Sequence, residues 1–279
     1  GSITSGGTES VLMAVKAARD FARSGRGELG RPPGERPNRA PGARLNIIAA
    51  TSVHPAFDKA CHALDMEIRK VPVGADLRAD VGAMAAVMDP DTCLVVGTAF
   101  TFPHGVVDDI PSLAAAAQAR GVPCHVDACL GGFILAFTSE AGFPPTPFDF
   151  RVPGVTSLSA DLHKYGYAAK GASIVLYRDV ALRRHQFFAT LDWSGGIYAS
   201  PTMAGTRPGG AIAAAWAVMR HLGRDGYVLL TRQVIETAHR LRDGIAAIPG
   251  LRLLGQPLYS VIAFEGVPAG GEGAGAGGG

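Results

Sequence analysis

Short apolar runs alternate with helical segments along most of the 279-residue chain. Parallel strands need a crossover connection, which a helix commonly supplies, so this alternation is typical of a mostly parallel sheet. We therefore expect an α/β fold whose sheet is flanked by helices. The candidate strands lie at 45–50, 92–96, 122–126, 155–159 and 173–177, and the candidate helices at 9–23, 57–64, 110–120 and 210–222.

A further long helix at 227–248, followed by strands at 251–254 and 259–264, predicts the start of a smaller domain. We expect a large domain at 1–222, the beginning of a small domain at 223–266 and a disordered Gly-rich tail at 267–279.

Composition narrows the class of protein. The net charge of +2 is too small to indicate nucleic-acid binding. The sequence also has no run of about 18 or more apolar residues, the length that a membrane-spanning helix needs. No signal-peptide pattern opens the chain. The four cysteines have no Cys-x-x-Cys spacing, so we expect buried thiols in a reduced, cytoplasmic protein and no metal site. The Arg-, Pro- and Gly-rich stretch at 25–44 is predicted to be a flexible surface loop.

A lysine beside a histidine follows one of the predicted strands. His163 and Lys164 come shortly after the strand at 155–159. An amine buried there would lose hydration, which would lower its pKa and make it a nucleophile toward a carbonyl. Lys164 is therefore a candidate for a Schiff base, although most lysines are solvated surface charges.

Two glycines stand directly before the first predicted helix, in Thr4-Ser-Gly-Gly-Thr-Glu-Ser10. Glycines let backbone N–H groups approach an anion closely, and the helix dipole favours negative charge at this end. The turn therefore predicts a phosphate site, with Thr8 as the helix N-cap. An ordinary glycine turn before a capped helix is the alternative.

Two more segments indicate a planar, charged ligand. Asp127 ends a predicted strand in apolar surroundings, where a carboxylate needs a cationic or hydrogen-bonding partner. A protonated pyridine nitrogen is such a partner, as in proteins that bind pyridoxal phosphate. His54 lies at a strand-to-helix junction, where an aromatic ring can stack on a cofactor. The alternatives are a loop-capping aspartate and a hydrogen-bonded histidine without a ligand.

Together these four segments resemble the group II decarboxylase superfamily of pyridoxal-phosphate enzymes and, within it, the sphingosine-1-phosphate lyases. The resemblance runs from the first residue to about Glu265 and is weakest at 24–44. The stretch at 193–209, Trp-Ser-Gly-Gly-Ile-Tyr-Ala-Ser-Pro-Thr-Met-Ala-Gly-Thr-Arg-Pro-Gly, is the most lyase-like part. The resemblance implies the fold type I architecture and a homodimer in which residues 193–208 reach the partner's cofactor.

The resemblance also implies the role of each candidate residue. Lys164 would carry pyridoxal phosphate as a Schiff base, Asp127 would pair with the ring nitrogen, and His54 would stack on the ring. Lys170 matches a second catalytic lysine, serving the substrate's phosphate or a proton transfer, with a surface lysine as the alternative. The implied cofactor-binding set is Gly7, Thr8, His54, Thr98, Asp127, His163 and Lys164.

The implied reaction is retro-aldol cleavage of a sphingoid-base 1-phosphate to a long-chain aldehyde and phosphoethanolamine. An amino-acid decarboxylase with the same cofactor is the first alternative, because spacing alone does not show which substrate bond is oriented for cleavage. The second is an inactive fragment, because family members carry a long segment before the phosphate turn. That segment supplies substrate contacts and, in eukaryotic lyases, an anchor to the endoplasmic reticulum membrane, so the resemblance implies an abbreviated enzyme.

Overall fold

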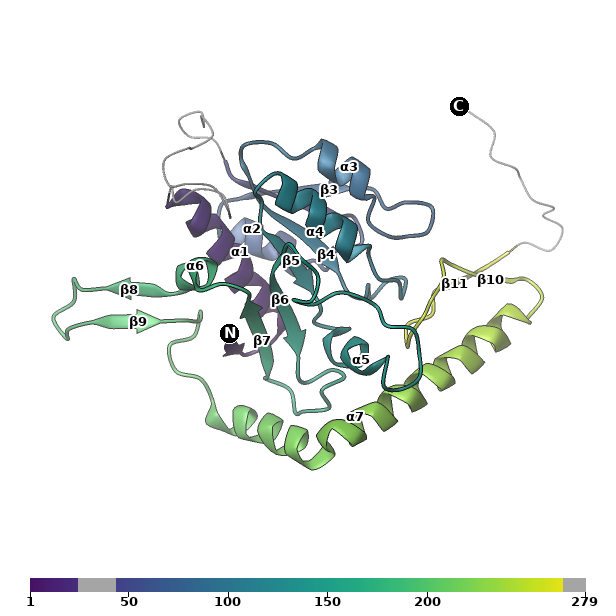
Figure 1. Ribbon diagram of the computed structural model, residues 1–279. Coiled ribbons are helices and arrows are strands. Elements are labelled where there is room, and N and C mark those ends of the chain that lie inside the picture. The colour runs from purple at the N-terminus through teal and green to yellow at the C-terminus, as the bar shows by residue number, and fades with distance from the viewer. Residues whose placement is uncertain (25–43, 268–279) are drawn as a thin grey trace.

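A computed structural model describes residues 1–24 and 44–267 of the chain. The loop expected at 25–44 lies outside the described residues except for Arg44, and the tail expected at 267–279 lies outside them except for Val267. Figure 1 shows a central sheet with helices on both sides, a hairpin that extends away from it and a long helix that runs along the lower side of the view.

In the described part of the chain, the central sheet has seven strands in the order β1-β7-β6-β5-β4-β2-β3. Neighbouring strands from β3 to β6 are parallel, whereas β7 runs antiparallel to both β6 and β1. The predicted α/β fold with a mostly parallel sheet is confirmed. The bounds are β1 Ser2–Thr4, β2 Asn46–Ala50, β3 Glu67–Val71, β4 Thr92–Thr98, β5 Cys124–Asp127, β6 Val155–Asp161 and β7 Ser173–Tyr177.

Helices cover the two faces of this sheet with separate apolar cores. Successive side chains of a strand point to opposite faces, so Ile47 of β2 packs with α1 and α2, whereas Ile48 packs with α3, α4 and α5. Both isoleucines are fully buried. The bounds of these helices are α1 Gly7–Arg23, α2 Ala56–Ala63, α3 Val81–Ala86, α4 Ile110–Ala119 and α5 Gly132–Phe137.

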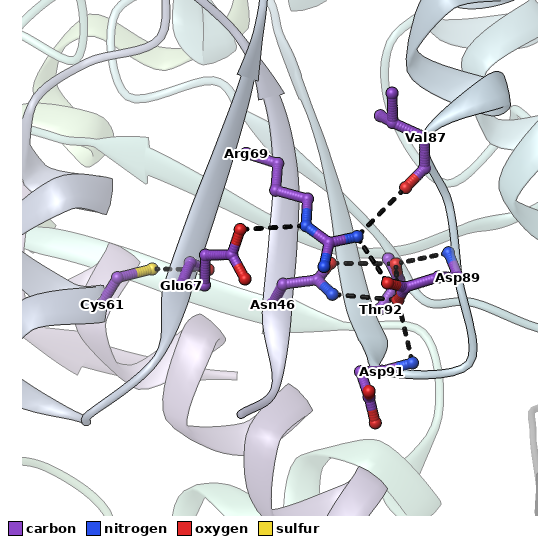
Figure 2. A network of polar contacts seen from close by, with 8 residues as sticks. All are labelled: Asn46, Cys61, Glu67, Arg69, Val87, Asp89, Asp91 and Thr92. Atoms are coloured by element: carbon purple, nitrogen blue, oxygen red, sulfur yellow. Dashed lines mark hydrogen bonds and ion pairs between the residues drawn. The ribbon is translucent and has the colours of Figure 1, made fainter. Parts of the chain in front are cut away.

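A polar network ties the amino ends of β2, β3 and β4 together (Figure 2). The Asp89 carboxylate, just before β4, accepts hydrogen bonds from the Asn46 amide (3.0 Å), the Arg69 guanidinium (2.5 Å) and the Asp91 N–H (2.9 Å). The network lies at the end of the strands that is opposite to their carboxyl termini, so it supports the sheet and takes no part in the site described below.

Some predicted elements differ from the structure. β3 was not expected, because Glu67, Arg69 and Lys70 interrupt its apolar pattern; it is an edge strand, where charged side chains are common. The short helices α3 and α5 were not expected either. The strand expected at 259–264 is wrong: β11 is Phe264–Gly266, and Tyr259 is instead buried in the core, where its hydroxyl bonds to Thr146.

The last part of the described chain consists of one long helix and two short hairpins. α7 spans Gly209–Ala246 and is kinked at Gly223, whose φ of 58° and ψ of −173° are not helical. After the kink, the Tyr227 ring stacks on Phe137 of α5 at 5.2 Å. The division into two domains at 222 and 223 remains a prediction. The other elements are α6 Val180–Arg183, a 3-10 turn at Arg184–Gln186, the hairpin β8 Phe188–Thr190 and β9 Tyr198–Ser200, and the hairpin β10 Leu251–Leu253 and β11.

Among the residues that the structure describes, no helix combines the length and the apolar character that a membrane crossing requires.

Candidate active site

A cavity of about 660 Å³ opens at the carboxyl ends of β4, β5 and β6, next to the start of α1. Ligands of α/β proteins commonly bind at this end of a parallel sheet. The strand register places Thr98, Asp127 and Ser159 side by side on β4, β5 and β6. Seven of the eight predicted site residues line the cavity: Gly7, Thr8, His54, Thr98, Asp127, His163 and Lys164.

The eighth predicted residue, Lys170, does not line this cavity. It is exposed in the turn between β6 and β7. Its catalytic role therefore remains a prediction.

The predicted phosphate turn lies between β1 and α1. The first N–H groups of a helix have no acceptor inside the helix, so those of Gly7 and Thr8 are available to a ligand at the cavity. The prediction that Thr8 caps the helix is wrong, because α1 starts two residues earlier, at Gly7, and its N-cap is Gly6. Gly7 has no room for a side chain: a Cβ there would lie 2.8 Å from the Asp161 carboxylate and 3.0 Å from the Cys129 sulfur.

Glu9 connects this turn to a distant loop. Its carboxylate accepts hydrogen bonds from the Ser5 N–H (2.7 Å) and from the N–H groups of Met203 (3.0 Å) and Ala204 (3.4 Å). Arg207 of the same loop donates to the Ile3 carbonyl (2.9 Å). The loop that follows β9 is therefore held against the start of α1.

Asp127 presents a carboxylate at the end of β5 and is only 5% exposed. Its Oδ1 accepts hydrogen bonds from the Cys129 N–H (3.0 Å) and the Ser159 hydroxyl (3.4 Å). Among the described residues Asp127 forms no ion pair. A cationic group bound in the cavity is therefore the partner that this buried carboxylate lacks.

Lys164 faces an aspartate that the sequence analysis did not assign to the site. Its Nζ lies 3.0 Å from Oδ2 of Asp161, which is 2% exposed. Burial of Lys164 would lower the pKa of its amine, but the charge of Asp161 and its hydrogen bond outweigh burial and raise the pKa above its ordinary value. The predicted lowering of this pKa is thus wrong, because burial also brings the Asp161 carboxylate close to the amine.

Three buried polar atoms near the cavity have no hydrogen-bond partner among the described residues: the Ser52 hydroxyl, Oδ1 of Asp161 and Nδ1 of His163. Such atoms are rare in folded proteins and suggest a missing ligand. Ser52 and Asp161 were missed as site residues, although both lie in segments singled out in the sequence, Ser52-Val-His54 and Asp161-Leu-His-Lys164.

The remaining predicted residues sit on the walls of the cavity. His54 is exposed to it, and its Nδ1 accepts a hydrogen bond from the Ala56 N–H at 3.1 Å, which fixes the ring at the start of α2. Thr98 is held by Asp108, whose carboxylate accepts the Thr98 N–H at 2.7 Å. Phe57, the aromatic residue that follows His54 in α2, does not line the cavity, since it is fully buried beside the His125 ring.

These residues fit pyridoxal phosphate. The cofactor has an aldehyde, a basic ring nitrogen and a phosphate. The cavity offers an amine at Lys164, an unpaired carboxylate at Asp127 and helix N–H groups with an unpartnered imidazole nitrogen at His163. Each reactive group of the cofactor thus has a complementary group on the walls.

Comparison with known proteins gives the same assignment. Residues 1–266 match the family model described as the pyridoxal-dependent decarboxylase conserved domain. Its description names pyridoxal dependence, in agreement with the cofactor predicted from the sequence.

Curated relatives include sphingosine-1-phosphate lyase 1 of Rattus norvegicus, 49% identical over 95% of this chain and 44% of the relative. The lyase of Oryza sativa is 46% identical over 95% of this chain and 46% of the relative. The chain therefore spans about half the length of these curated relatives.

Among solved structures, the sphingosine-1-phosphate lyase of Burkholderia pseudomallei superposes with a TM-score of 0.86 at 41% identity, over 95% of this chain and 57% of that one. The glutamate decarboxylase of Lactobacillus brevis superposes with a TM-score of 0.79 at 22% identity, over 96% of this chain and 60% of that one, which shows a shared fold. The chain belongs to the family of pyridoxal-dependent decarboxylases, as its sequence predicted.

Proposed function

We propose that this chain is a pyridoxal-phosphate-dependent carbon–carbon lyase that cleaves sphingoid-base 1-phosphates to a long-chain aldehyde and phosphoethanolamine. One observation carries the cofactor-dependent part: Lys164, Asp127 and the glycine turn before α1 line the same cavity. The identity of 41–49% to proteins named sphingosine-1-phosphate lyases supports the substrate class.

When bound, pyridoxal phosphate supplies an electron-withdrawing ring that stabilises the negative charge left when a bond to the substrate's α carbon breaks. Asp127 would hold the proton on the ring nitrogen through the carboxylate oxygen that is not used by Cys129 and Ser159. The ring face would lie against His54. Lys164 would supply the amine that binds the aldehyde carbon. The amine would first have to lose a proton, and the Asp161 carboxylate stabilises its protonated form.

The phosphate would bind at the start of α1. The N–H groups of Gly7 and Thr8 would donate to it, and the helix dipole favours its negative charge. His163, which lines the same cavity, would contribute its unpartnered Nδ1. Thr98 would contact the cofactor from β4. For Lys170 we propose contact with the substrate's phosphate or a proton transfer, which loss of activity in a Lys170→Ala variant with normal cofactor binding would support.

A decarboxylase acting on amino acids is the second candidate. The probable L-aspartate decarboxylase of Pyrococcus furiosus is 33% identical over 95% of this chain and 67% of that protein. The two activities differ in which bond to the substrate's α carbon is oriented for cleavage. If the chain releases carbon dioxide from aspartate and forms no aldehyde from a sphingoid phosphate, the decarboxylase replaces our proposal.

We further propose a cytoplasmic homodimer. The loop after β9 lies beside the phosphate turn of its own chain through Glu9. The hairpin that precedes this loop extends away from the sheet (Figure 1). Several of its apolar side chains are exposed. In a dimer this hairpin would reach toward the partner's cofactor. Any association with the endoplasmic reticulum membrane would depend on a segment other than the one described.

The test is to incubate the purified chain with pyridoxal phosphate and a sphingoid 1-phosphate and to assay long-chain aldehyde. Lys164→Ala should bind no cofactor covalently and form no aldehyde, because Lys164 is the only lysine among the described residues that line the cavity. Lys59→Ala, an exposed lysine on α2 outside the cavity, is the matched control and should keep both. Aldehyde formation by Lys164→Ala would overturn the proposal, and a chain that never binds the cofactor would support an inactive fragment instead.

A further inference from the structure

A chain of buried hydrogen bonds leads from Asp127 into the core behind the cavity. Ser159 of β6 is fully buried, and its hydroxyl lies 3.4 Å from Oδ1 of Asp127, 3.2 Å from the Cys129 sulfur and 3.3 Å from Nε2 of His125. Nδ1 of His125 lies 2.9 Å from the Ser157 hydroxyl. The function proposed above uses Asp127 but does not use the groups behind it.

The direction of each proton in this chain follows from the carboxylate. Asp127 can only accept, so the single Ser159 proton points to it. The two lone pairs of the Ser159 oxygen are then available to accept the Cys129 S–H and an N–H at Nε2 of His125. A neutral imidazole with its proton on Nε2 has an acceptor at Nδ1, which the Ser157 hydroxyl satisfies. Each side-chain proton in the chain is thereby donated to one acceptor.

The imidazole is held neutral at physiological pH. Full burial lowers the pKa of His125 to about 4, against the opposing charge of Asp127. The chain therefore delivers hydrogen bonds to Asp127 without delivering a positive charge, and the cationic partner must come from the cavity. Because both bonds from Cys129 and Ser159 go to Oδ1, the other oxygen stays available to that partner.

We infer that Ser159 and His125 are positioning residues that orient the Asp127 carboxylate toward the ring nitrogen of the bound cofactor. The inference rests on the proposed function, because it assumes that Asp127 binds that nitrogen. Uncharged side chains on β6 and β5 thus set the orientation of Asp127, and His125 acts on it through Ser159.

A double-mutant cycle on cofactor affinity tests this inference. Ser159→Ala removes the hydroxyl that connects Asp127 to His125, and a hydrogen bond to a charged group is worth enough to weaken cofactor binding about tenfold. In an Asp127→Asn background the same change should cause no further loss, since Ser159 acts only through the carboxylate. Affinity is measured by equilibrium dialysis against pyridoxal phosphate.

Thr138→Ala is the control, because it removes a buried hydroxyl that donates to the Leu135 carbonyl and belongs to no part of this hydrogen-bonded chain. It should lower the melting temperature while leaving cofactor affinity nearly unchanged. Equal losses in affinity for Thr138→Ala and Ser159→Ala would overturn the inference, since they would indicate general damage to the fold.

The outcomes separate this inference from the proposed function. If Asp127→Asn alone leaves affinity unchanged, the role of Asp127 fails, and the inference fails with it. If Asp127→Asn weakens binding and Ser159→Ala weakens it equally in both backgrounds, the inference alone fails. Nitrogen NMR of histidine-labelled protein needs no variant: a neutral His125 with its proton on Nε2 supports the inference, and a charged ring or the other tautomer overturns it.

Discussion

At the scale of single residues, Asp161 sets the proton state of Lys164. The two side chains form the ion pair at 3.0 Å that raises the pKa of the amine against the effect of burial. An amine must be unprotonated to attack an aldehyde. Cofactor attachment should therefore become faster as the pH rises toward the pKa of Lys164.

Replacing Asp161 by Asn should move this profile to lower pH. Without the carboxylate, the largest contribution that opposes burial is lost, so the pKa of the amine falls and a larger fraction of Lys164 is unprotonated at neutral pH. Attachment should then be several-fold faster at neutral pH, which stopped-flow absorbance of the protein with pyridoxal phosphate measures. Asp58→Asn, which removes a surface partner of Lys70, is the control. An unshifted profile for Asp161→Asn would contradict the role of the ion pair.

Seven of the residues that line the cavity could be predicted from the sequence, whereas the direction of the pKa shift of Lys164 could not. Short motifs at the ends of strands and at one helix start indicated Lys164, Asp127 and Gly7, because the carboxyl ends of parallel strands meet at one edge of the sheet. The direction of the Lys164 pKa shift could not be predicted, since it depends on whether the Asp161 side chain turns toward the amine. Spacing of three residues permits that contact but does not impose it.

At the scale of elements, the network around Asp89 joins three strands and should make stability depend on pH. Burial would raise the pKa of Asp89, but hydrogen bonds from Asn46, Arg69 and their neighbours lower it from 3.8 to about 2. A carboxyl with a depressed pKa in the folded state stabilises the fold above its unfolded pKa, and this contribution is lost as the pH falls from about 4 toward about 2.

Asp89→Ala should therefore lower the free energy of unfolding at neutral pH by about 1–3 kcal/mol, because it removes the carboxylate that accepts from both the Asn46 amide and the Arg69 guanidinium. The difference from the wild type should shrink near pH 2. Urea unfolding at the two pH values measures both. A difference that is the same at neutral and acidic pH would contradict the electrostatic origin.

The kink in α7 makes a second prediction at this scale. Gly223 has φ of 58° with open space around it, so a side chain there meets no atom but strains the backbone. Gly223→Ala should destabilise the protein by about 1–3 kcal/mol. Gly244→Ala in the same helix, also in open space but with helical backbone, should stabilise it by about 0.5–1 kcal/mol. Thermal unfolding compares them, and equal effects would contradict this account.

Elements were predictable where the apolar pattern was continuous. β2 and β4 are buried along their whole length and read as apolar runs. β3 could not be recognised, because an edge strand is half exposed and carries charges. The start of α1 could not be predicted from the preference of threonine for the N-cap position. Gly6 is the N-cap, and the Glu9 carboxylate accepts a hydrogen bond from the Ser5 N–H.

At the scale of the whole molecule, the β8–β9 hairpin exposes apolar side chains that a single chain leaves in water. Leu191 is 77% and Ile197 is 78% exposed, and Trp193 lies between them. Contiguous apolar surface of this kind marks interaction sites. The proposed homodimer would bury this apolar surface. From the sequence, the homodimer is expected only through the family resemblance.

A double variant, Trp193→Ser with Ile197→Ser, should weaken dimerisation by about tenfold or more, since large aromatic and aliphatic side chains dominate interface energies. Val180→Ser, an equally exposed apolar residue on α6, should leave it unchanged. Sedimentation velocity over a range of concentrations measures the dimer. A wild-type chain that sediments as a monomer at all concentrations would contradict the proposal.

Glu9 gives this architecture a thermodynamic consequence. It stands in the first turn of the helix whose start would hold the coenzyme's anionic group, and it also fastens the loop next to the hairpin. Coupling between two binding events is reciprocal. If coenzyme binding at this turn strengthens subunit pairing, diluting the subunits apart must promote coenzyme loss by the same factor.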